Sequence, residues 1–223
     1  DPPELPRKLR VVLGVDPEQP LDGAIATVRQ LAGHGLELHV VHIFAPRNDA
    51  DLARCRAALD AEGLGGTWIQ RGSDPAQGLI EVARDQAADI IAIAAPGSRG
   101  KVAKDLLAHS PTHILVARRP PKRPDGLVAI LATDHTDYMA ACVDRLVELR
   151  PSGIGELVVL TANEIVAETA ALLVNGLPQL VGKAEDWVTE RIELENARIA
   201  DRFARFCGHV NALARAGVTK DVI

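Results

Sequence analysis

A short loop with two glycines and two basic residues is the part of this sequence best suited to bind an anion. Its chemistry-bearing residues are Gly97, Arg99, Gly100 and Lys101. The apolar run Ile90–Ile93 before it predicts a strand, and the spacing of apolar residues over 102–107 predicts a helix behind it. At the carboxyl end of a parallel strand, such a loop and the free backbone N–H groups of the next helix can hold a phosphate. The alternative is a plain tight turn with two solvated cations.

The first 119 residues alternate between strand patterns and helix patterns. Five apolar runs of strand length are separated by four stretches in which apolar residues recur with helical spacing. The predicted strands are Leu9–Val15, Leu36–Phe44, Thr67–Ile69, Ile90–Ile93 and Ile114–Ala117. The first of them is apolar almost throughout, as expected of a parallel strand that is buried on both faces. The pattern therefore predicts an α/β fold with a doubly wound, parallel, five-stranded sheet.

A charged, proline-rich stretch at residues 120–126 indicates an exposed linker, and the pattern restarts after it. A shift of 118 residues, without a gap, places Asp134 on Asp16 and the apolar run Leu127–Leu131 on the first strand. Such a match predicts an internal repeat, with a tandem copy of the first domain. The expected domains are residues 1–119 and 127–223.

The second copy is expected to diverge after its first half. We expect a short helix over 167–173 and a long helix whose apolar face extends from Val188 to Leu213. A third strand is expected to begin within 217–223, so the sheet lacks the strands that complete it in the first copy. Because such a sheet would expose a long edge, we expect further residues or another chain to complete this core.

The stretch from Asp89 to Ala117 resembles the last third of a universal stress protein domain. The resemblance rests on the segments DIIAI (89–93), GSRG (97–100), VAKDLLAHSP (102–111) and ILVA (114–117). It implies the strand order 3-2-1-4-5 for the five-stranded sheet. The family is also known to place two copies of the domain in one chain.

ATP-binding members of that family carry Gly-x2-Gly-x9-Gly-(Ser/Thr) in this loop, and this sequence departs from the motif. When the motif is counted from the strand end, Ala94 and Gly97 take the first pair of positions, and Gly100 and Lys101 take the last pair. Only two residues then stand where nine are expected, so the loop is seven residues short. The other count, which starts at Gly97 and Gly100, would put Pro111 into the helix that the motif caps. The short loop is either a true deletion or a longer loop from which residues are missing.

The resemblance implies an adenine-nucleotide site at the carboxyl end of the sheet. The matching residues are Val15, Asp16, Ile43, Ala94, Gly97, Arg99, Gly100, Lys101 and Val102, with Asp134 in the second copy. In the family the aspartate contacts the nucleotide, so Asp16 would accept hydrogen bonds from ribose hydroxyls, and Ile43 would pack against the adenine. The alternatives are a turn or helix cap for Asp16 and a core position for Ile43. Thr161 aligns with Ile43 in the second copy, which weakens the case for adenine there.

No constellation of side chains in the sequence indicates catalysis or a metal site. His39 and His42 are three apart on a predicted strand, so they point to opposite faces and cannot chelate one ion. The leading hypothesis is a stress-response module that acts on partners through conformational change. Such a module would either bind ATP or another adenine nucleotide weakly, or have lost the ability to bind it. The alternatives are an enzyme of the same fold that hydrolyses ATP slowly and a purely structural interaction protein.

The composition argues against several other partners and locations. A net charge of −5 at pH 7 and only 3% aromatic residues argue against nucleic-acid binding, which needs a basic face. No apolar run approaches the ~20 residues of a membrane helix, and we expect no signal peptide or membrane partner. Three widely spaced cysteines suit buried thiols in a reducing compartment, so we expect a cytoplasmic protein. The resemblance implies a homodimer or pseudo-dimer through the edge strand Ile114–Ala117.

Overall fold

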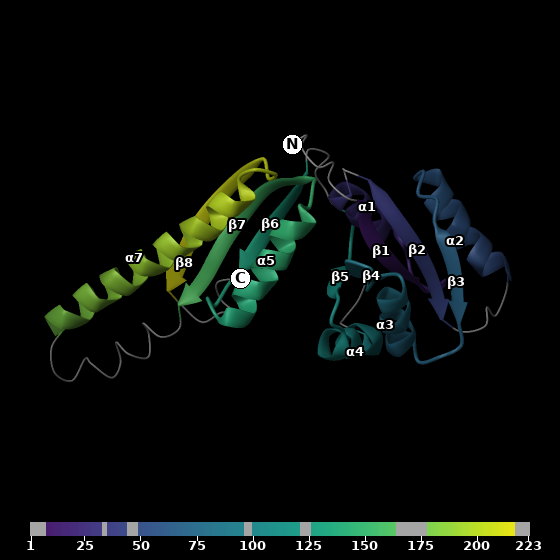
Figure 1. Cartoon of the computed structure of the whole chain (residues 1–223), viewed down its shortest axis with the longest axis horizontal. Coiled ribbons are helices and arrows are strands. Elements are labelled where there is room, and N and C mark those ends of the chain that lie inside the picture. Colours follow the sequence, from purple (N-terminus) through teal and green to yellow (C-terminus); the bar gives the residue numbers. More distant parts are fainter. Residues whose placement is uncertain are drawn as a thin grey trace. The chain divides into compact units, whose positions relative to one another are not determined.

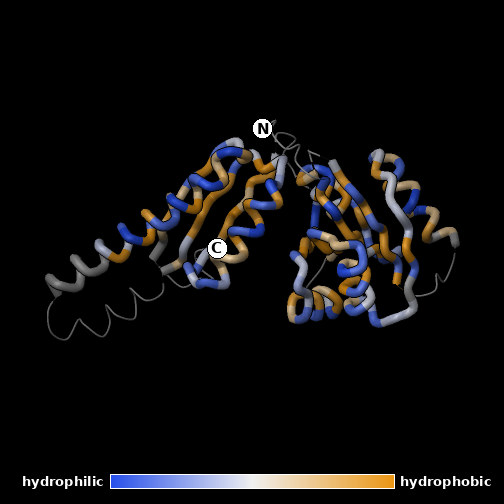
Figure 2. The backbone as a smooth tube through the Cα atoms, in the orientation of Figure 1, coloured by the Kyte–Doolittle hydropathy of each residue, from blue (hydrophilic) through white to orange (hydrophobic). Residues whose placement is uncertain are grey.

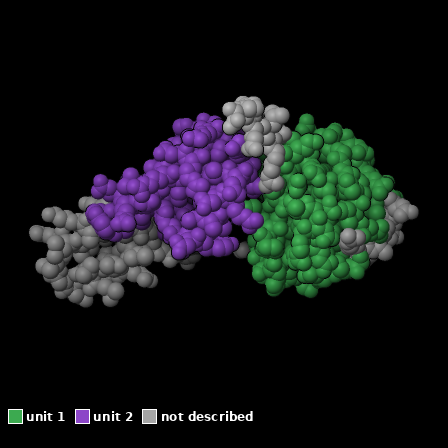
Figure 3. Space-filling view, in the orientation of Figure 1, with its two compact units in different colours: residues 1–124 green, residues 125–223 purple. Residues whose placement is uncertain are grey.

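The computed structural model describes residues 8–32, 35–43, 49–95, 100–120, 126–163 and 178–216. The chain divides into two compact units, Asp1–Pro124 and Asp125–Ile223, which Figure 3 colours separately. No helix in these ranges is both long enough and apolar enough to cross a membrane.

The N-terminal unit contains a parallel five-stranded sheet in the order β3-β2-β1-β4-β5 (Figure 1). Its strands are β1 (Leu9–Val15), β2 (Leu36–Ile43), β3 (Thr67–Arg71), β4 (Ile90–Ala94) and β5 (His113–Ala117). Its helices are α1 (Asp22–Leu31), α2 (Asp49–Ala61), α3 (Pro75–Asp85) and α4 (Lys101–His109). The predicted fold class and the strand order 3-2-1-4-5 are confirmed.

The two faces of this sheet are buried by different residues of the same strands. Val12, Val41 and Ile91 are completely buried and belong to the apolar cluster formed with α3 and α4. Val11 and Leu13 are equally buried, and they point to the opposite face because side chains alternate along a strand. Figure 2 shows hydrophobic residues concentrated on the strands, whereas the helices carry both hydrophobic and hydrophilic residues. A strand buried on both faces explains why β1 is apolar almost throughout.

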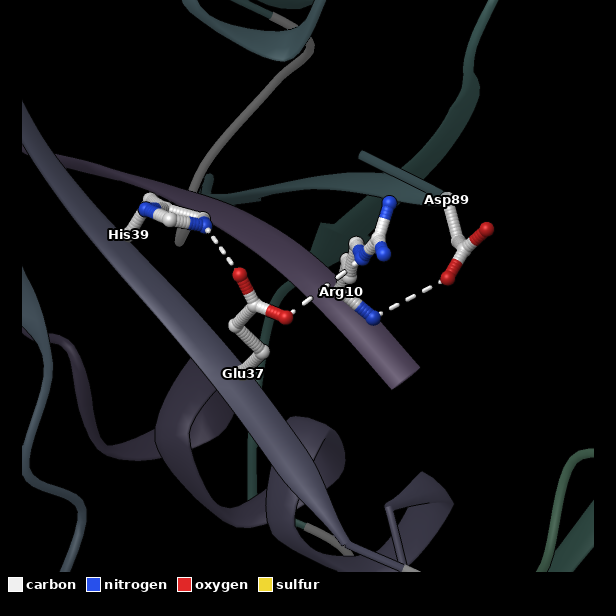
Figure 4. A network of polar contacts seen from close by, with 4 residues as sticks. All are labelled: Arg10, Glu37, His39 and Asp89. Carbon is white, nitrogen blue, oxygen red and sulfur yellow. Dashed lines mark hydrogen bonds and ion pairs between the residues drawn. The ribbon is translucent and has the colours of Figure 1, made fainter. Parts of the chain in front are cut away.

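Polar contacts hold the amino-terminal ends of the central strands together (Figure 4). The backbone N–H of Arg10 donates to Asp89 Oδ2 at 3.0 Å, and the N–H of Asp89 donates to the Arg10 carbonyl at 2.9 Å. Glu37 then lies between Arg10 Nε at 3.4 Å and His39 Nε2 at 3.3 Å. Because the Arg10 and Glu37 side chains are nearly half exposed, this ion pair contributes about 1 kcal/mol at most. The network fixes the start of β4 beside β1, at the end of the sheet away from the candidate site.

The C-terminal unit contains a parallel three-stranded sheet in the order β6-β7-β8 among its described residues. Its elements are β6 (Leu127–Ala132), α5 (Asp137–Leu149), β7 (Ile154–Asn163), α7 (Pro178–Phe203) and β8 (His209–Ala216). The helix predicted over 167–173 lies outside the described residues.

The expected third strand of this unit was misplaced. It lies at His209–Ala216 rather than within 217–223, which is outside the described residues, and the long helix ends at Phe203. Val210 and Leu213, assigned above to the helix, are on β8, which pairs with β7 along its whole length. Gly208 interrupts the helical pattern. Beyond it, pairing with the apolar strand β7 outweighs the helical spacing of the apolar residues.

Candidate functional site

Three strand ends that are distant in sequence meet at one edge of the N-terminal sheet. β1 is the central strand, and it pairs with β2 through Val15 and His42 and with β4 through Gly14 and Ile93. The strands are parallel, so their carboxyl ends lie side by side. Asp16, Ile43 and Ala94 therefore share the edge at which α/β folds collect ligands.

Asp16 follows β1 and is exposed. Its Oδ1 accepts a hydrogen bond from the Glu18 N–H at 3.0 Å, and its carbonyl accepts one from the Gln19 N–H at 2.9 Å. This is the turn that the sequence offered as the alternative function of Asp16. The turn uses only one carboxylate oxygen, and within the described residues Oδ2 accepts no hydrogen bond. Asp16 can therefore form the turn and accept a hydrogen bond from a ligand at the same time.

Ile43 ends β2 and is only 8% exposed. A Cβ placed on Gly78 of α3 would lie 2.7 Å from Ile43 Cδ1 and closer still to Ser73 Oγ. Because glycine has no side chain, Gly78 leaves room for both groups. Ile43 also belongs to the core cluster with α3 and α4. Val15 is buried with its side chain on the opposite face, so only its backbone is available at this edge.

Ser73 and Gly78 are neighbours of the candidate site that the sequence reasoning missed. A glycine inside the otherwise regular helix pattern of α3 was the available signal, because such a residue often marks a close approach. The helix begins at Pro75 with Asp74 as its N-cap residue: Asp74 Oδ1 accepts hydrogen bonds from the N–H groups of Ala76 and Gln77, at 3.1 and 3.3 Å.

The first turn of α4 supplies hydrogen-bond donors near the end of β4. Gly100 is its N-cap residue and makes no side-chain cap, and no acidic residue lies in the first turn. The N–H groups of Lys101, Val102 and Ala103 have no acceptor within the helix, because their partners would precede its start. Lys101 is exposed and Val102 is half-buried. Gly100 has open space around the position of a Cβ. This combination suits an anion.

The remaining predicted residues lie elsewhere. Gly97 and Arg99 are outside the described residues. Asp134 follows β6 in the C-terminal unit, where its Oδ1 accepts hydrogen bonds from the Thr136 N–H at 3.0 Å and the Thr136 hydroxyl at 2.8 Å. These bonds, the backbone one first, lower the pKa of Asp134 below its ordinary value of 3.8. Within the described ranges, no three His, Cys, Asp or Glu side chains gather as a metal site would require.

No protein-family model matches the sequence, and no curated protein matches it. Solved structures do match. A universal stress protein from Archaeoglobus fulgidus DSM 4304 aligns with 94% of this chain and 79% of its own, at 13% identity and a TM-score of 0.52. A functionally unknown protein from Pseudomonas aeruginosa PAO1 aligns with 94% of this chain and 75% of its own, at 15% identity and a TM-score of 0.52.

A shorter universal stress protein, solved in complex with cAMP, aligns with 49% of this chain and 95% of its own, at 22% identity and a TM-score of 0.41. The ligand belongs to that protein. The longer alignments show that this chain has the universal stress protein fold, as the resemblance in its sequence predicts.

Proposed function

We propose that the N-terminal unit binds an adenine nucleotide at the carboxyl edge of its sheet and passes the binding event to partner proteins through a conformational change. The observation that carries the proposal is that three groups lie on neighbouring elements at this edge. They are the Asp16 carboxylate oxygen that accepts no hydrogen bond within the described residues, the apolar end of Ile43, and the first turn of α4, whose N-cap residue Gly100 provides no side-chain cap. A stress-response role and a cytoplasmic location are part of the same proposal.

Each of these groups has a definite task in the proposed complex. Asp16 Oδ2 would accept a hydrogen bond from a ribose hydroxyl, and Ile43 would form an apolar wall for the base. The N–H groups of the first turn of α4 would hold a phosphate, with the ammonium group of Lys101 adding favourable charge. With the loop between β4 and α4 as short as it is in this sequence, too few backbone donors would be present to wrap a triphosphate. We therefore propose that the site holds one phosphate group and binds ATP weakly.

The sharpest variant is Asp16→Asn. Its amide oxygen can still accept the hydrogen bond from the Glu18 N–H, so the turn survives, while an NH2 group replaces the free acceptor. A charge-assisted hydrogen bond contributes about 1.5–3 kcal/mol, so the affinity for AMP should fall roughly 10- to 100-fold. Asp16→Ala should abolish any measurable binding. Asp85→Ala is the matched control, because Asp85 is exposed at the far end of α3.

Binding is best tested in two steps. Mass spectrometry of the supernatant from the denatured protein shows whether adenine nucleotide co-purifies with the chain, and calorimetry then compares AMP with ATP. ATP binding at a micromolar or lower Kd would contradict the single-phosphate site. Binding of AMP that is unaffected by Asp16→Asn would refute the proposed location.

We also propose that two copies of this chain, or its two units, associate through the edge of β5. This strand lies at one end of the sheet order, and its residues His113–Val116 are half-buried. Its sequence from Ile114 to Ala117 carries no charge that would oppose pairing with another strand. Light scattering should report a dimer if copies associate. A monomer whose β5 amides exchange rapidly would contradict both forms of the proposal.

A further inference from the structure

The two units differ in the register of their first strand pair. β1 and β2 pair without interruption, from Leu9 with Leu36 to Val15 with His42. β6 and β7 begin with the corresponding pair, Leu127 with Ile154, but the next pair is Val128 with Glu156. Gly155 is therefore an extra residue in β7, a β-bulge. Beyond it, each residue of β7 is displaced by one position relative to the gapless sequence repeat.

The bulge sits where backbone segments crowd together. A Cβ on Gly126 would lie 2.7 Å from the Gly155 nitrogen, and a Cβ on Gly208 would lie 2.8 Å from the Gly155 carbonyl oxygen. Contacts this short to the backbone cannot be relieved by turning a side chain. Glycines at these positions therefore leave the space that the backbone of the bulge occupies.

The bulge corrects the expected equivalence between Thr161 and Ile43. Because side chains alternate along a strand, a shift of one residue turns each of them to the other face. Gly14 pairs with Val41, and its counterpart Ala132 pairs with Leu160. By this register Thr161 occupies the place of His42, and Ala162 occupies the place of Ile43.

Thr161 is the centre of a buried hydrogen-bond network. Its hydroxyl donates to Asn196 Oδ1 at 3.0 Å, and Asn196 Nδ2 donates to the Leu213 carbonyl at 2.7 Å. His135 Nε2 lies 3.0 Å from the same hydroxyl. Thr161 has one proton and gives it to Asn196, so His135 must donate from Nε2. Asn196 is completely buried and Thr161 is 5% exposed.

We propose that this network is a lock that holds α7 on the sheet. We also propose that the chain has one nucleotide site, in the N-terminal unit, because the small side chain of Ala162 stands in the place of Ile43 and offers no comparable wall for a base. The one-site part rests on the function proposed above. Asn196 lies on α7, Thr161 on β7 and the Leu213 carbonyl on β8, so the network joins the helix to both strands that it covers. Turning Thr161 toward a ligand would leave a buried amide unpaired, which is costly. Asp134 accepts both of its hydrogen bonds from Thr136 through Oδ1, much as Asp16 uses one oxygen in its turn, so the one-site inference depends on Ala162 and not on Asp134.

The first test counts nucleotide sites on the full chain. Calorimetry with AMP should give one site per chain. Asp16→Asn should remove it, whereas Asp134→Asn should leave affinity and stoichiometry unchanged. Two sites per chain, or loss of binding in Asp134→Asn, would overturn the one-site inference. Absence of any AMP binding would remove both the proposed function and the one-site inference, and the lock would still be decided by the second test.

The second test needs no nucleotide. Hydrogen exchange of the α7 and β8 amides is compared in Thr161→Val and Thr161→Ser, because only valine removes the hydroxyl. Thr161→Val should raise the exchange rates of these amides about tenfold or more, since it leaves Asn196 Oδ1 unpaired in a buried site. Thr161→Ser should exchange much more like the original protein. Equal exchange in the two variants, or no acceleration by valine, would overturn the lock.

Discussion

The attachment of α4 to the sheet can be tested with two adjacent leucines. Leu106 is completely buried in the cluster with Ile91 and Ile93, whereas Leu107 is 55% exposed on the same helix. Leu106→Ala should destabilise the N-terminal unit by about 2–5 kcal/mol, because it loses the transfer free energy of the side chain and leaves a cavity. Leu107→Ala should cost less than about 1.5 kcal/mol, because roughly half of that side chain already contacts water.

The comparison is well controlled because both substitutions change helix propensity equally. Urea unfolding should be followed by tryptophan fluorescence in a Trp187→Phe background, which leaves Trp68 of β3 as the reporter for the N-terminal unit. The same variants should be titrated with AMP. Because Leu106 anchors the helix whose first turn is proposed to hold the phosphate, Leu106→Ala should also weaken binding.

Similar losses of stability in the two variants would refute the packing argument, since the two leucines differ only in burial. A large loss in Leu106→Ala with unchanged AMP affinity would have a different meaning. It would separate the stability of α4 from the proposed anion site and count against the role assigned to its first turn.

Three further predictions concern the C-terminal unit. The lowered pKa of Asp134 means that its contribution to stability is present above pH 3.8 and is lost as the pH falls below that value. Thr136→Val removes the hydroxyl donor and keeps the backbone N–H, so NMR titration should show a partial rise of this pKa. An unchanged pKa would contradict the part assigned to the Thr136 hydroxyl. Burial raises the pKa of the Cys207 thiol above 9.0. At pH 7 a thiol reagent should therefore modify Cys207 far more slowly in the folded chain than in urea. Equal rates of modification under the two conditions would show that the thiol is accessible in the folded chain. Val128 and Ile130 on β6 are 50% and 53% exposed. Ile130→Thr should therefore change the free energy of unfolding by less than about 1 kcal/mol and reduce light scattering during refolding. A larger loss of unfolding free energy would mean that this face of the sheet is covered.

Local sequence patterns were sufficient to predict the fold of the N-terminal unit. The strand pattern over Leu36–Phe44 became β2 at Leu36–Ile43, and the Asp74-Pro75 pair marks the start of α3, with Asp74 as its cap. These signals are reliable because each depends on neighbours in the chain: the period of apolar residues, a capping side chain and a fixed proline φ angle. The order of the elements then predicted the α/β class, and the resemblance of residues 89–117 to a universal stress protein domain supplied the strand order.

The candidate site was predictable in its positions but not in its surroundings. Sequence reasoning brought Asp16, Ile43 and the start of α4 to one edge, because parallel strands end on the same side of a sheet. It could not show that Asp16 uses one carboxylate oxygen in a turn and leaves the other available to a ligand. It also could not show that Ser73 and Ile43 both approach the position where a residue other than Gly78 would have its Cβ. Both depend on side-chain geometry between separate elements.

The sequence by itself determined which stretches can be strands or helices, through periodicity, turn residues and the gapless repeat. Only the tertiary structure decided which residues of the two units correspond. Gly155 adds a residue to β7, although the sequence match between the two units has no gap. The sequence match put Thr161 in the place of Ile43, whereas in the structure Thr161 faces α7. The assignment of Val210 and Leu213 to a strand was decided in the same way, by pairing with β7. Strand register is set by long-range backbone hydrogen bonds and face burial, and a displacement of one residue reverses every side chain beyond it.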